Sequence, residues 1–195
     1  MEHKHHGKSS AGFLNADEIL SQLNLTGNET FMDAGCGDGY ISKKAMENYL
    51  SAGKVYAVDV YDDAIKRMND FKNENNIQNL INVQGDISKE IPEINDESVD
   101  VILMVNVFHG FKASGEMDKV IVELKKLLKT NGRMAIVDFK PLDMSFGPPA
   151  EIRLSHIELE ELFKKHGFKK TYLNVDIGEE IPEGKSHFFV IFEKE

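Results

Sequence analysis

Hydrophobic and polar residues alternate along this chain in a repeated strand–helix rhythm. Five short apolar runs, each bounded by polar or turn residues, predict strands, and one of them is apolar enough for the middle of a parallel sheet. Amphipathic segments between these runs predict helices, because their apolar residues recur every three or four positions. The five expected strands cover 29–35, 54–60, 80–86, 99–107 and 133–139.

The expected helices begin and end at recognisable local signals. Asn15 or Asp17 can cap the first helix. Ser155, with Glu158 three residues later, forms a capping box for the last one. An Asn-Gly pair at 131–132 is expected to end the helix before it. The expected helices cover 15–25, 38–50, 62–73, 114–132 and 155–167, and 88–98 is expected as a loop.

The end of the chain departs from this rhythm. Residues 140–153 hold three of the five prolines and predict an irregular segment. Two expected strands, 168–178 and 186–194, follow with a connection that is too short for a parallel crossover. The sequence therefore predicts an α/β fold, namely a doubly wound, seven-stranded, mostly parallel, Rossmann-like sheet with the last strand antiparallel. Residues 1–14 are expected to form a flexible tail, and 15–195 a single domain.

Charge and composition argue against several classes of protein. The chain has 195 residues and a net charge of −10, which disfavours a protein that grips a long nucleic acid. No apolar run is long enough to cross a bilayer, and the first residues lack a signal-peptide core, so we expect a cytoplasmic protein without a membrane partner. The single cysteine, Cys36, excludes an internal disulfide and a Cys-rich zinc site, and we expect no bound metal. His3, His5 and His6 are similar to a metal-binding tract but are expected to belong to the flexible tail.

Three glycines follow the first predicted strand within five residues, in the sequence DAGCGDG. Gly35, Gly37 and Gly39 allow a sharp turn and let a ligand lie against bare backbone. Their spacing is G-x-G-x-G, whereas the dinucleotide fingerprint is G-x-G-x-x-G. Asp33 and Asp38 would repel a pyrophosphate but suit an ammonium or another positively charged ligand. The loop therefore indicates a cationic ligand and disfavours NAD.

Carboxylates also occur at the ends of the next two strands. Asp59 lies 20 residues after Gly39, where an acidic side chain accepts hydrogen bonds from the two ribose hydroxyls of an adenosine. Asp86, at the end of the third strand, can accept a hydrogen bond from the exocyclic amine of an adenine. An amino-acid ammonium, a ribose and an adenine are all parts of S-adenosyl-L-methionine, whose sulfonium is cationic. We therefore expect S-adenosyl-L-methionine as the cofactor.

From about Asn15 onward the sequence resembles class I S-adenosylmethionine-dependent methyltransferases. The resemblance implies that DAGCGDG is the cofactor loop and that VDVYDDAI carries the ribose acid. It is strongest for a small-molecule branch that includes quinone-biosynthesis C-methyltransferases and arsenite methyltransferases, although a single cysteine disfavours arsenite as substrate. The cofactor-binding residues that we expect are Asp33, Gly35, Cys36, Gly37, Gly39, Asp59, Val60, Gly85, Asp86, Ile87, Asn106 and Val107.

Other residues near the expected site have two interpretations each. His109, after the fourth strand, is either a general base for methyl transfer or a hydrogen-bonded packing residue. Lys140 and Arg153 flank the proline-rich segment and either meet an anionic acceptor or form surface salt bridges. An apolar set either lines an acceptor pocket or packs in a lid, and its members are Phe111, Leu142, Met144 and Phe146.

The sequence thus predicts a methyltransferase that moves the methyl group of its cofactor to a small-molecule acceptor by in-line displacement. A base is often unnecessary for this step, because the sulfonium is already activated and alignment does most of the work. The acceptor is expected beneath a lid formed by the first residues and 140–153, in a monomer or homodimer without nucleic acid. Three alternatives stay open: an RNA or protein methyltransferase, a non-catalytic cofactor-binding or partner subunit, and an NAD-dependent oxidoreductase.

Overall fold

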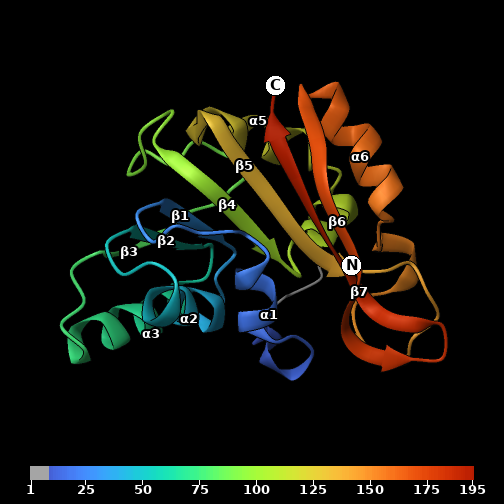
Figure 1. Ribbon diagram of the computed structural model, residues 1–195, viewed down its shortest axis with the longest axis horizontal. Helices are drawn as coiled ribbons and strands as arrows, with labels where there is room; N and C mark the ends of the chain where they lie inside the picture. Colours follow the sequence, from blue (N-terminus) through green and yellow to red (C-terminus); the bar gives the residue numbers. More distant parts are fainter. Residues whose placement is uncertain (1–8) are drawn as a thin grey trace.

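The computed structural model describes residues 9–195, in which seven strands form one sheet (Figure 1). The strand order is β3-β2-β1-β4-β5-β7-β6. Strands β1 to β5 pair in parallel, whereas β7 is antiparallel to both β5 and β6. This topology confirms the predicted doubly wound α/β fold with an antiparallel last strand. The strands are β1 (Thr30–Ala34), β2 (Lys54–Asp59), β3 (Leu80–Gln84), β4 (Val99–Val105), β5 (Leu128–Phe139), β6 (Phe168–Ile181) and β7 (Gly184–Lys194).

Helices cover both faces of the sheet. In Figure 1, α1, α2 and α3 lie on one side of the strands, and α4, α5 and α6 lie on the other. Two single turns of 3-10 helix, η1 and η2, precede α1 and α6. The helical elements are η1 (Ser10–Gly12), α1 (Ala16–Ser21), α2 (Tyr40–Asn48), α3 (Asp62–Glu74), α4 (Phe108–Ser114), α5 (Met117–Leu127), η2 (Ala150–Ile152) and α6 (His156–Lys165).

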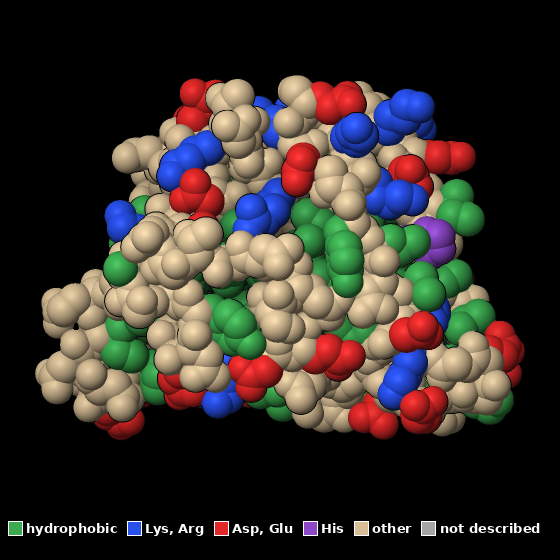
Figure 2. Space-filling model, viewed as in Figure 1, with side chains coloured by type: hydrophobic (Ala, Val, Ile, Leu, Met, Phe, Trp, Pro, Cys, Tyr) green, Lys and Arg blue, Asp and Glu red, His purple; other side chains and the backbone are tan. Residues whose placement is uncertain are grey.

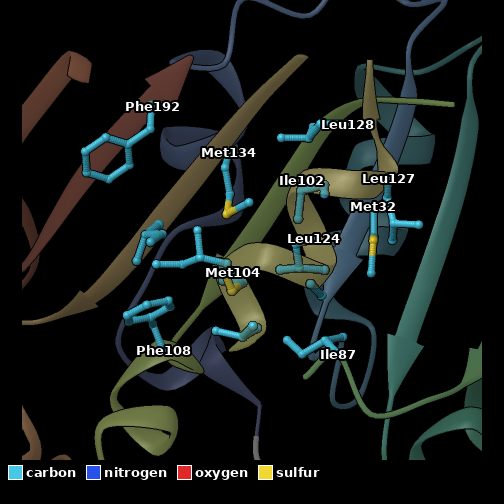
Figure 3. Packing of buried hydrophobic residues seen from close by; sticks show 14 of the residues in the cluster. Met32, Ile87, Ile102, Met104, Phe108, Leu124, Leu127, Leu128, Met134 and Phe192 are labelled. Atoms are coloured by element: carbon cyan, nitrogen blue, oxygen red, sulfur yellow. The ribbon is translucent and has the colours of Figure 1, made fainter. Parts of the chain in front are cut away.

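The central strands contribute to two cores, because successive side chains of a strand point to opposite faces. In β4, Val101 and Leu103 join the core under α1, α2 and α3. Ile102 and Met104 join the core under α4, α5 and α6, where Figure 3 shows them near Leu124 of α5. All five side chains are fully buried, and burying one such side chain stabilises the fold by about 1.5–3 kcal/mol. A strand buried on both faces explains why the run 99–107 is almost continuously apolar.

The direction of β7 decides which of its residues lie at the carboxyl edge of the parallel strands. Because β7 is antiparallel to β5, its beginning lies beside the end of β5, and His187 pairs with Phe139. Side chains near the start of β7 therefore reach the same edge as the loops that follow β1, β2, β3 and β4. In an open parallel sheet this is the edge at which ligands bind.

Two helical elements differ from the sequence-based expectation. The helix expected over 114–132 ends at Leu127, and the chain continues directly as β5. Leu128 is fully buried and pairs with Val99 of β4, so burial beside a neighbouring strand outweighs the Asn-Gly stop signal. The sequence pattern also does not predict α4, which ends at Ser114 and is followed by Gly115 with a left-handed φ of +72°.

The capping box before α6 agrees with the sequence-based prediction, whereas the connection of the last hairpin is shorter than predicted. The Ser155 hydroxyl accepts a hydrogen bond from the Glu158 amide at 3.2 Å, and the Glu158 carboxylate accepts one from the Ser155 amide at 2.8 Å. This arrangement confirms the predicted capping box. The connection expected over 179–185 is shorter, because β6 extends to Ile181 and β7 begins at Gly184.

The described chain begins with a segment that contacts the rest of the fold. Leu14 is buried, and the ring of Phe13 stacks on Phe146 with centroids 5.3 Å apart. His3, His5 and His6 lie outside the described residues, so their role stays a prediction. Within residues 9–195, no helix is long and apolar enough to cross a membrane.

Candidate functional site

The glycine loop lies at the carboxyl end of β1, where the chain turns into α2. Gly35, Gly37 and Gly39 all have positive φ, at 85°, 56° and 78°, a region that residues with a side chain rarely adopt. A Cβ at Gly35 would lie 2.5 Å from a Val107 methyl carbon, and one at Gly39 would lie 1.9 Å from the Met68 sulfur. Side chains are therefore excluded from this loop for two reasons. The turn needs positive φ, and neighbouring elements pack against the backbone.

The cysteine of this loop is part of its packing. Cys36 is buried, and its amide donates to the Val58 carbonyl at 2.9 Å, beside the Gly35 amide at 2.8 Å on the same oxygen. Burial raises the pKa of the Cys36 thiol, and the nearby carboxylates of Asp33 and Asp59 raise it further. A buried neutral thiol is a poor nucleophile. Cys36 therefore supports the loop and has no reactive character.

Asp59 connects the end of β2 to the glycine loop. One carboxylate oxygen accepts a hydrogen bond from the Gly37 amide at 2.8 Å, and the other accepts one from the Tyr61 amide at 3.0 Å. Each carboxylate oxygen has a second lone pair, so a ribose hydroxyl can still donate to it. Val60 follows directly and is 54% exposed, which is unusual for a valine beside a buried strand. The pair offers an acceptor and an apolar surface to a nucleoside.

Asp33 is buried below the loop, and its carboxylate faces the first turn of α2. It accepts hydrogen bonds from the Ser42 hydroxyl at 2.6 Å and from the Ser42 amide at 3.1 Å. Burial raises the pKa of Asp33 to about 7, and repulsion from Asp59 and Asp38 adds to this rise, although the Ser42 hydrogen bonds oppose it. A cation bound nearby would favour the ionised carboxylate. The three acids therefore suit a positively charged ligand.

The side chains of the loop after β3 form bonds mainly with one another. The Asp86 carboxylate accepts from the Ser88 hydroxyl at 2.7 Å and forms an ion pair with Lys89 at 2.9 Å. Partial burial acts to raise the pKa of Asp86, but the bonds from Lys89 and Ser88 outweigh it and lower that pKa. The Gly85 amide donates to the Asp59 carbonyl at 3.0 Å, and Ile87 is buried. The adenine-binding role of Asp86, and the cofactor-binding role of Gly85 and Ile87, stay predictions.

Asn106 has an unusual backbone and an unpaired side-chain oxygen at the end of β4. Its φ is +58°, and its amide donates to the Val137 carbonyl at 2.8 Å. Its side-chain Oδ1 is buried and has no hydrogen-bond partner among the described residues. A buried acceptor without a partner costs free energy, which a ligand that donates a hydrogen bond would recover. The cofactor-binding role expected for Asn106 and Val107 stays a prediction.

His109 and Asp138 form a buried pair between the start of α4 and the end of β5. The Asp138 carboxylate accepts hydrogen bonds from the His109 backbone amide at 2.9 Å and the Phe139 amide at 2.8 Å. The His109 Nδ1 lies 2.7 Å from the same carboxylate. Burial would raise the pKa of Asp138, but His109 and the amide donors hold it below its usual value. Asp138 is therefore ionised and His109 Nδ1 carries the shared proton.

Sequence reasoning identified His109 but not Asp138. The signal was present, since an acidic residue directly before the end of β5 lies next to the end of β4 in a parallel pair. His109 is only 2% exposed, which agrees with a hydrogen-bonded packing residue, and its role as a general base stays a prediction.

Arg153 shapes the proline-rich segment that follows β5. Its guanidinium donates to the carbonyls of Pro148 at 2.8 Å and Phe146 at 3.0 Å, and also to that of Leu142. Arg153 is 4% exposed, so the expected surface salt bridge at this residue is wrong. The side chain instead holds residues 140–153 in a closed loop, because guanidinium fits several acceptors in one plane.

A cluster of aromatic rings lies where this loop, the start of the described chain and β7 meet. The Phe139 ring lies 5.9 Å from Phe13, 6.3 Å from Phe146 and 4.0 Å from His187, measured between centroids. Phe13 and Phe146 stack with an interplanar angle of 9°. Of the expected apolar set, Phe146 belongs to this cluster, whereas Phe111 packs on Phe108 in the core. Sequence reasoning missed His187, because only the pairing of β7 with β5 brings it here.

The family comparison agrees with this geometry. A family model described as a methyltransferase domain matches residues 25–187. The chain belongs to this family. A solved S-adenosylmethionine-dependent methyltransferase from Aquifex aeolicus is 26% identical, with a TM-score of 0.79 over 93% of this chain and 90% of that one. A putative type 11 methyltransferase from Sulfolobus solfataricus is also 26% identical, with a TM-score of 0.69 over 93% of each chain.

These findings confirm an S-adenosylmethionine-dependent methyltransferase domain. The described residues also fit the cofactor, because the loop is bare, acids surround it and the Asn106 oxygen lacks a partner. An uncharacterized RNA methyltransferase of Clostridium acetobutylicum is 31% identical over 86 residues, which are 44% of this chain and 18% of that protein. The chain thus matches less than a fifth of the length of this curated relative.

Proposed function

We propose that the protein transfers a methyl group from S-adenosylmethionine to a small-molecule acceptor. The observation that carries this proposal is the closed carboxyl edge of the sheet. The stack of Phe13 on Phe146 and the loop held by Arg153 cover the end of β5 and the start of β7. Such a cover suits a small compound better than a folded RNA or protein. The net charge of −10 disfavours RNA as the acceptor, and on the face in Figure 2 acidic and basic side chains are interspersed.

The same edge supports the cofactor assignment. Gly35, Gly37 and Gly39 would let the cofactor lie against the backbone, and Asp59 would accept from its ribose hydroxyls. Val60 would pack on the adenine. The Asn106 Oδ1 would accept a hydrogen bond from the ammonium of the methionine part.

When bound, S-adenosylmethionine supplies a methyl group that its sulfonium has already activated. The protein residues then orient the acceptor, exclude water and hold protons. Asp138 keeps the His109 ring in one orientation, with its Nδ1 proton toward the carboxylate. Where the acceptor atom needs no deprotonation, alignment alone accounts for the catalysis.

The cofactor part of the proposal is tested by the variant Asp59→Ala. Its affinity for S-adenosylmethionine should fall by about 100-fold, because two charge-assisted hydrogen bonds to the ribose are lost. Calorimetric titration measures this affinity. Asp70→Ala is the matched control, since Asp70 is an exposed acid on α3, and it should bind like the unaltered protein. Equal affinities in a folded Asp59→Ala variant would overturn the assignment.

The acceptor part has a competing candidate, because the matching curated relative is described as an RNA methyltransferase. Incubation with methyl-labelled cofactor decides between them when one sample holds a metabolite extract and another holds total RNA. We expect the label in a low-mass compound, identified by mass spectrometry. Label in the RNA sample alone would replace the small-molecule proposal with the RNA one, and unlabelled samples in both would favour a non-catalytic role.

A further inference from the structure

One polar atom in the aromatic cluster has no partner. His187 is fully buried near the start of β7, and its Nδ1 lies 2.7 Å from the Ser186 hydroxyl. Among the described residues, no hydrogen-bond partner reaches its Nε2. Buried polar atoms in folded proteins are nearly always paired, so an unpaired one calls for a partner that a ligand would supply.

The neighbours of His187 indicate which hydrogen-bonding role Nε2 has. The Ser186 hydroxyl already accepts a hydrogen bond from the Glu179 amide at 2.9 Å. Ser186 is fully buried, and among the described residues its hydroxyl hydrogen has no acceptor in reach other than Nδ1. Donation to Nδ1 places the imidazole proton on Nε2. Burial lowers the pKa of His187 to about 4, so the ring is neutral at neutral pH. His187 therefore offers one neutral N–H donor.

The surroundings of this donor are aromatic. The Phe139 ring lies 4.0 Å from the His187 ring and 6.2 Å from the His109 ring, so it lies between the donor and the buried pair. Phe13 and Phe146 complete the cluster, and both are only partly buried. Aromatic rings pack well against another planar ring, in stacked or edge-to-face arrangements.

Charged groups of both signs lie near His187. The Asp138 carboxylate belongs to the same group of side chains and would repel an anion. Arg153 directs its guanidinium to three backbone carbonyls and is therefore committed to the loop. Lys140 begins that loop and is a second cation near His187, and burial lowers its pKa. The neutral His187 N–H itself suits an uncharged oxygen.

We propose that the acceptor is a small planar aromatic compound with an uncharged oxygen attached to its ring, and that the His187 Nε2–H binds this oxygen. The ring of the compound packs against Phe139 and Phe146, and Phe13 closes over it. This inference rests on the proposed methyltransferase function and names its class of acceptor. His187 is then a specificity-determining residue, because it distinguishes an oxygen-bearing ring from a plain hydrocarbon.

Phenol and toluene are the probes that test this specificity, since they differ mainly in the oxygen. Both are titrated into the full chain loaded with S-adenosylhomocysteine, and binding is followed by NMR. We expect phenol to bind about five-fold more tightly than toluene, the effect of one neutral hydrogen bond. Phenol should also shift the ring N–H resonance of His187, and toluene should leave it in place. Equal affinities, or an unmoved resonance at saturation with phenol, would overturn the inference.

Variants assign the preference to His187. His187→Phe removes the donor and should bring the two affinities to within about two-fold of each other, whereas His187→Gln retains an N–H donor and should restore part of the preference. His156→Phe is the matched control, because His156 Nδ1 is also buried without a partner but lies beside Phe188, outside the cluster. It should keep the full preference. A preference that persists in a folded His187→Phe variant contradicts the assignment.

Cofactor binding separates this inference from the proposed function. If the unaltered protein does not bind S-adenosylmethionine in calorimetry, the proposed function fails, and this inference fails with it. If it binds the cofactor and methylates a metabolite but shows no preference for phenol, only the acceptor class is wrong. Methylation of an aromatic alcohol, lost in His187→Phe with unchanged cofactor affinity, supports both.

Discussion

The glycine loop is constrained by its own neighbours as much as by a ligand. Gly35 combines a φ of +85° with a position against the Val107 side chain. Val107 precedes α4, so the close approach ties the loop after β1 to the loop after β4. Both loops belong to the proposed cofactor site. A side chain at Gly35 would therefore disturb the backbone of one loop and the packing of the other.

Substitution of Gly35 tests this coupling at a single residue. Gly35→Ala should destabilise the protein by about 2–4 kcal/mol, because alanine rarely adopts positive φ and its Cβ would overlap a Val107 methyl group. Urea unfolding measures the free energy. Gly110→Ala is the control, since Gly110 lies within α4 with nothing near its Cβ position, and it should be neutral or stabilising by up to about 1 kcal/mol. Two variants of equal stability would show that the close approach carries no strain.

At the scale of elements, the segment 140–153 is a loop held by one side chain. Its backbone carbonyls would otherwise face solvent or a hydrophobic surface, and Arg153 satisfies three of them from a buried position. Lys112 of α4 also donates to the Arg153 carbonyl at 2.8 Å, which joins the loop to the helix that carries His109. The loop and α4 are therefore expected to move together.

Replacement of Arg153 should release this loop and leave the sheet intact. Lysine keeps the charge but has no planar fork, so Arg153→Lys loses most of the carbonyl contacts. We expect amide hydrogen exchange in 142–152 to accelerate by about ten-fold or more, with β1 and β2 unchanged. Arg67→Lys serves as the control, because Arg67 is exposed on α3, and it should exchange like the unaltered protein. Equal exchange in both variants would mean that the prolines alone hold the loop.

Regular elements follow from local pattern, whereas their ends depend on tertiary pairing. The five parallel strands and the Ser155–Glu158 capping box are written in short stretches of sequence, so they can be predicted. The end of α5 is different, because the Asn-Gly pair is a local stop signal and the pairing of Leu128 with Val99 is not local. A helix as short as α4 carries too few apolar positions for its periodicity to be recognised.

The same distinction applies to the site. The glycine loop and Asp59 follow strands of known order, so spacing alone indicates them. His187 lies at the site only because β7 is inserted antiparallel beside β5, and Arg153 acts through backbone carbonyls that no motif records. A search for sequence motifs therefore does not find residues that only the strand order brings to the site.

At the scale of the whole molecule, two buried groups with shifted pKa values make contributions to stability that change with pH in opposite directions. Asp33 has a pKa raised from 3.8 to about 7, so the folded chain binds this proton more tightly than the unfolded chain. Its contribution to stability therefore falls as pH rises from about 4 to about 7. His187 has a pKa lowered from 6.5 to about 4, so the folded chain binds its proton more weakly. Its contribution rises with pH over nearly the same interval.

The two contributions should nearly cancel between about pH 4.5 and 6, because each changes the free energy of unfolding by about 1.4 kcal/mol per pH unit with opposite sign. Relative to the unaltered protein, Asp33→Asn should gain stability as pH rises, and His187→Gln should lose it. The double variant should return to the original slope. Urea unfolding at intervals of half a pH unit measures the free energy of unfolding of all four proteins. Subtracting the value for the unaltered protein cancels the contribution of the acids that titrate in every variant. Single variants with the original slope would show that these groups titrate alike in the folded and unfolded chains.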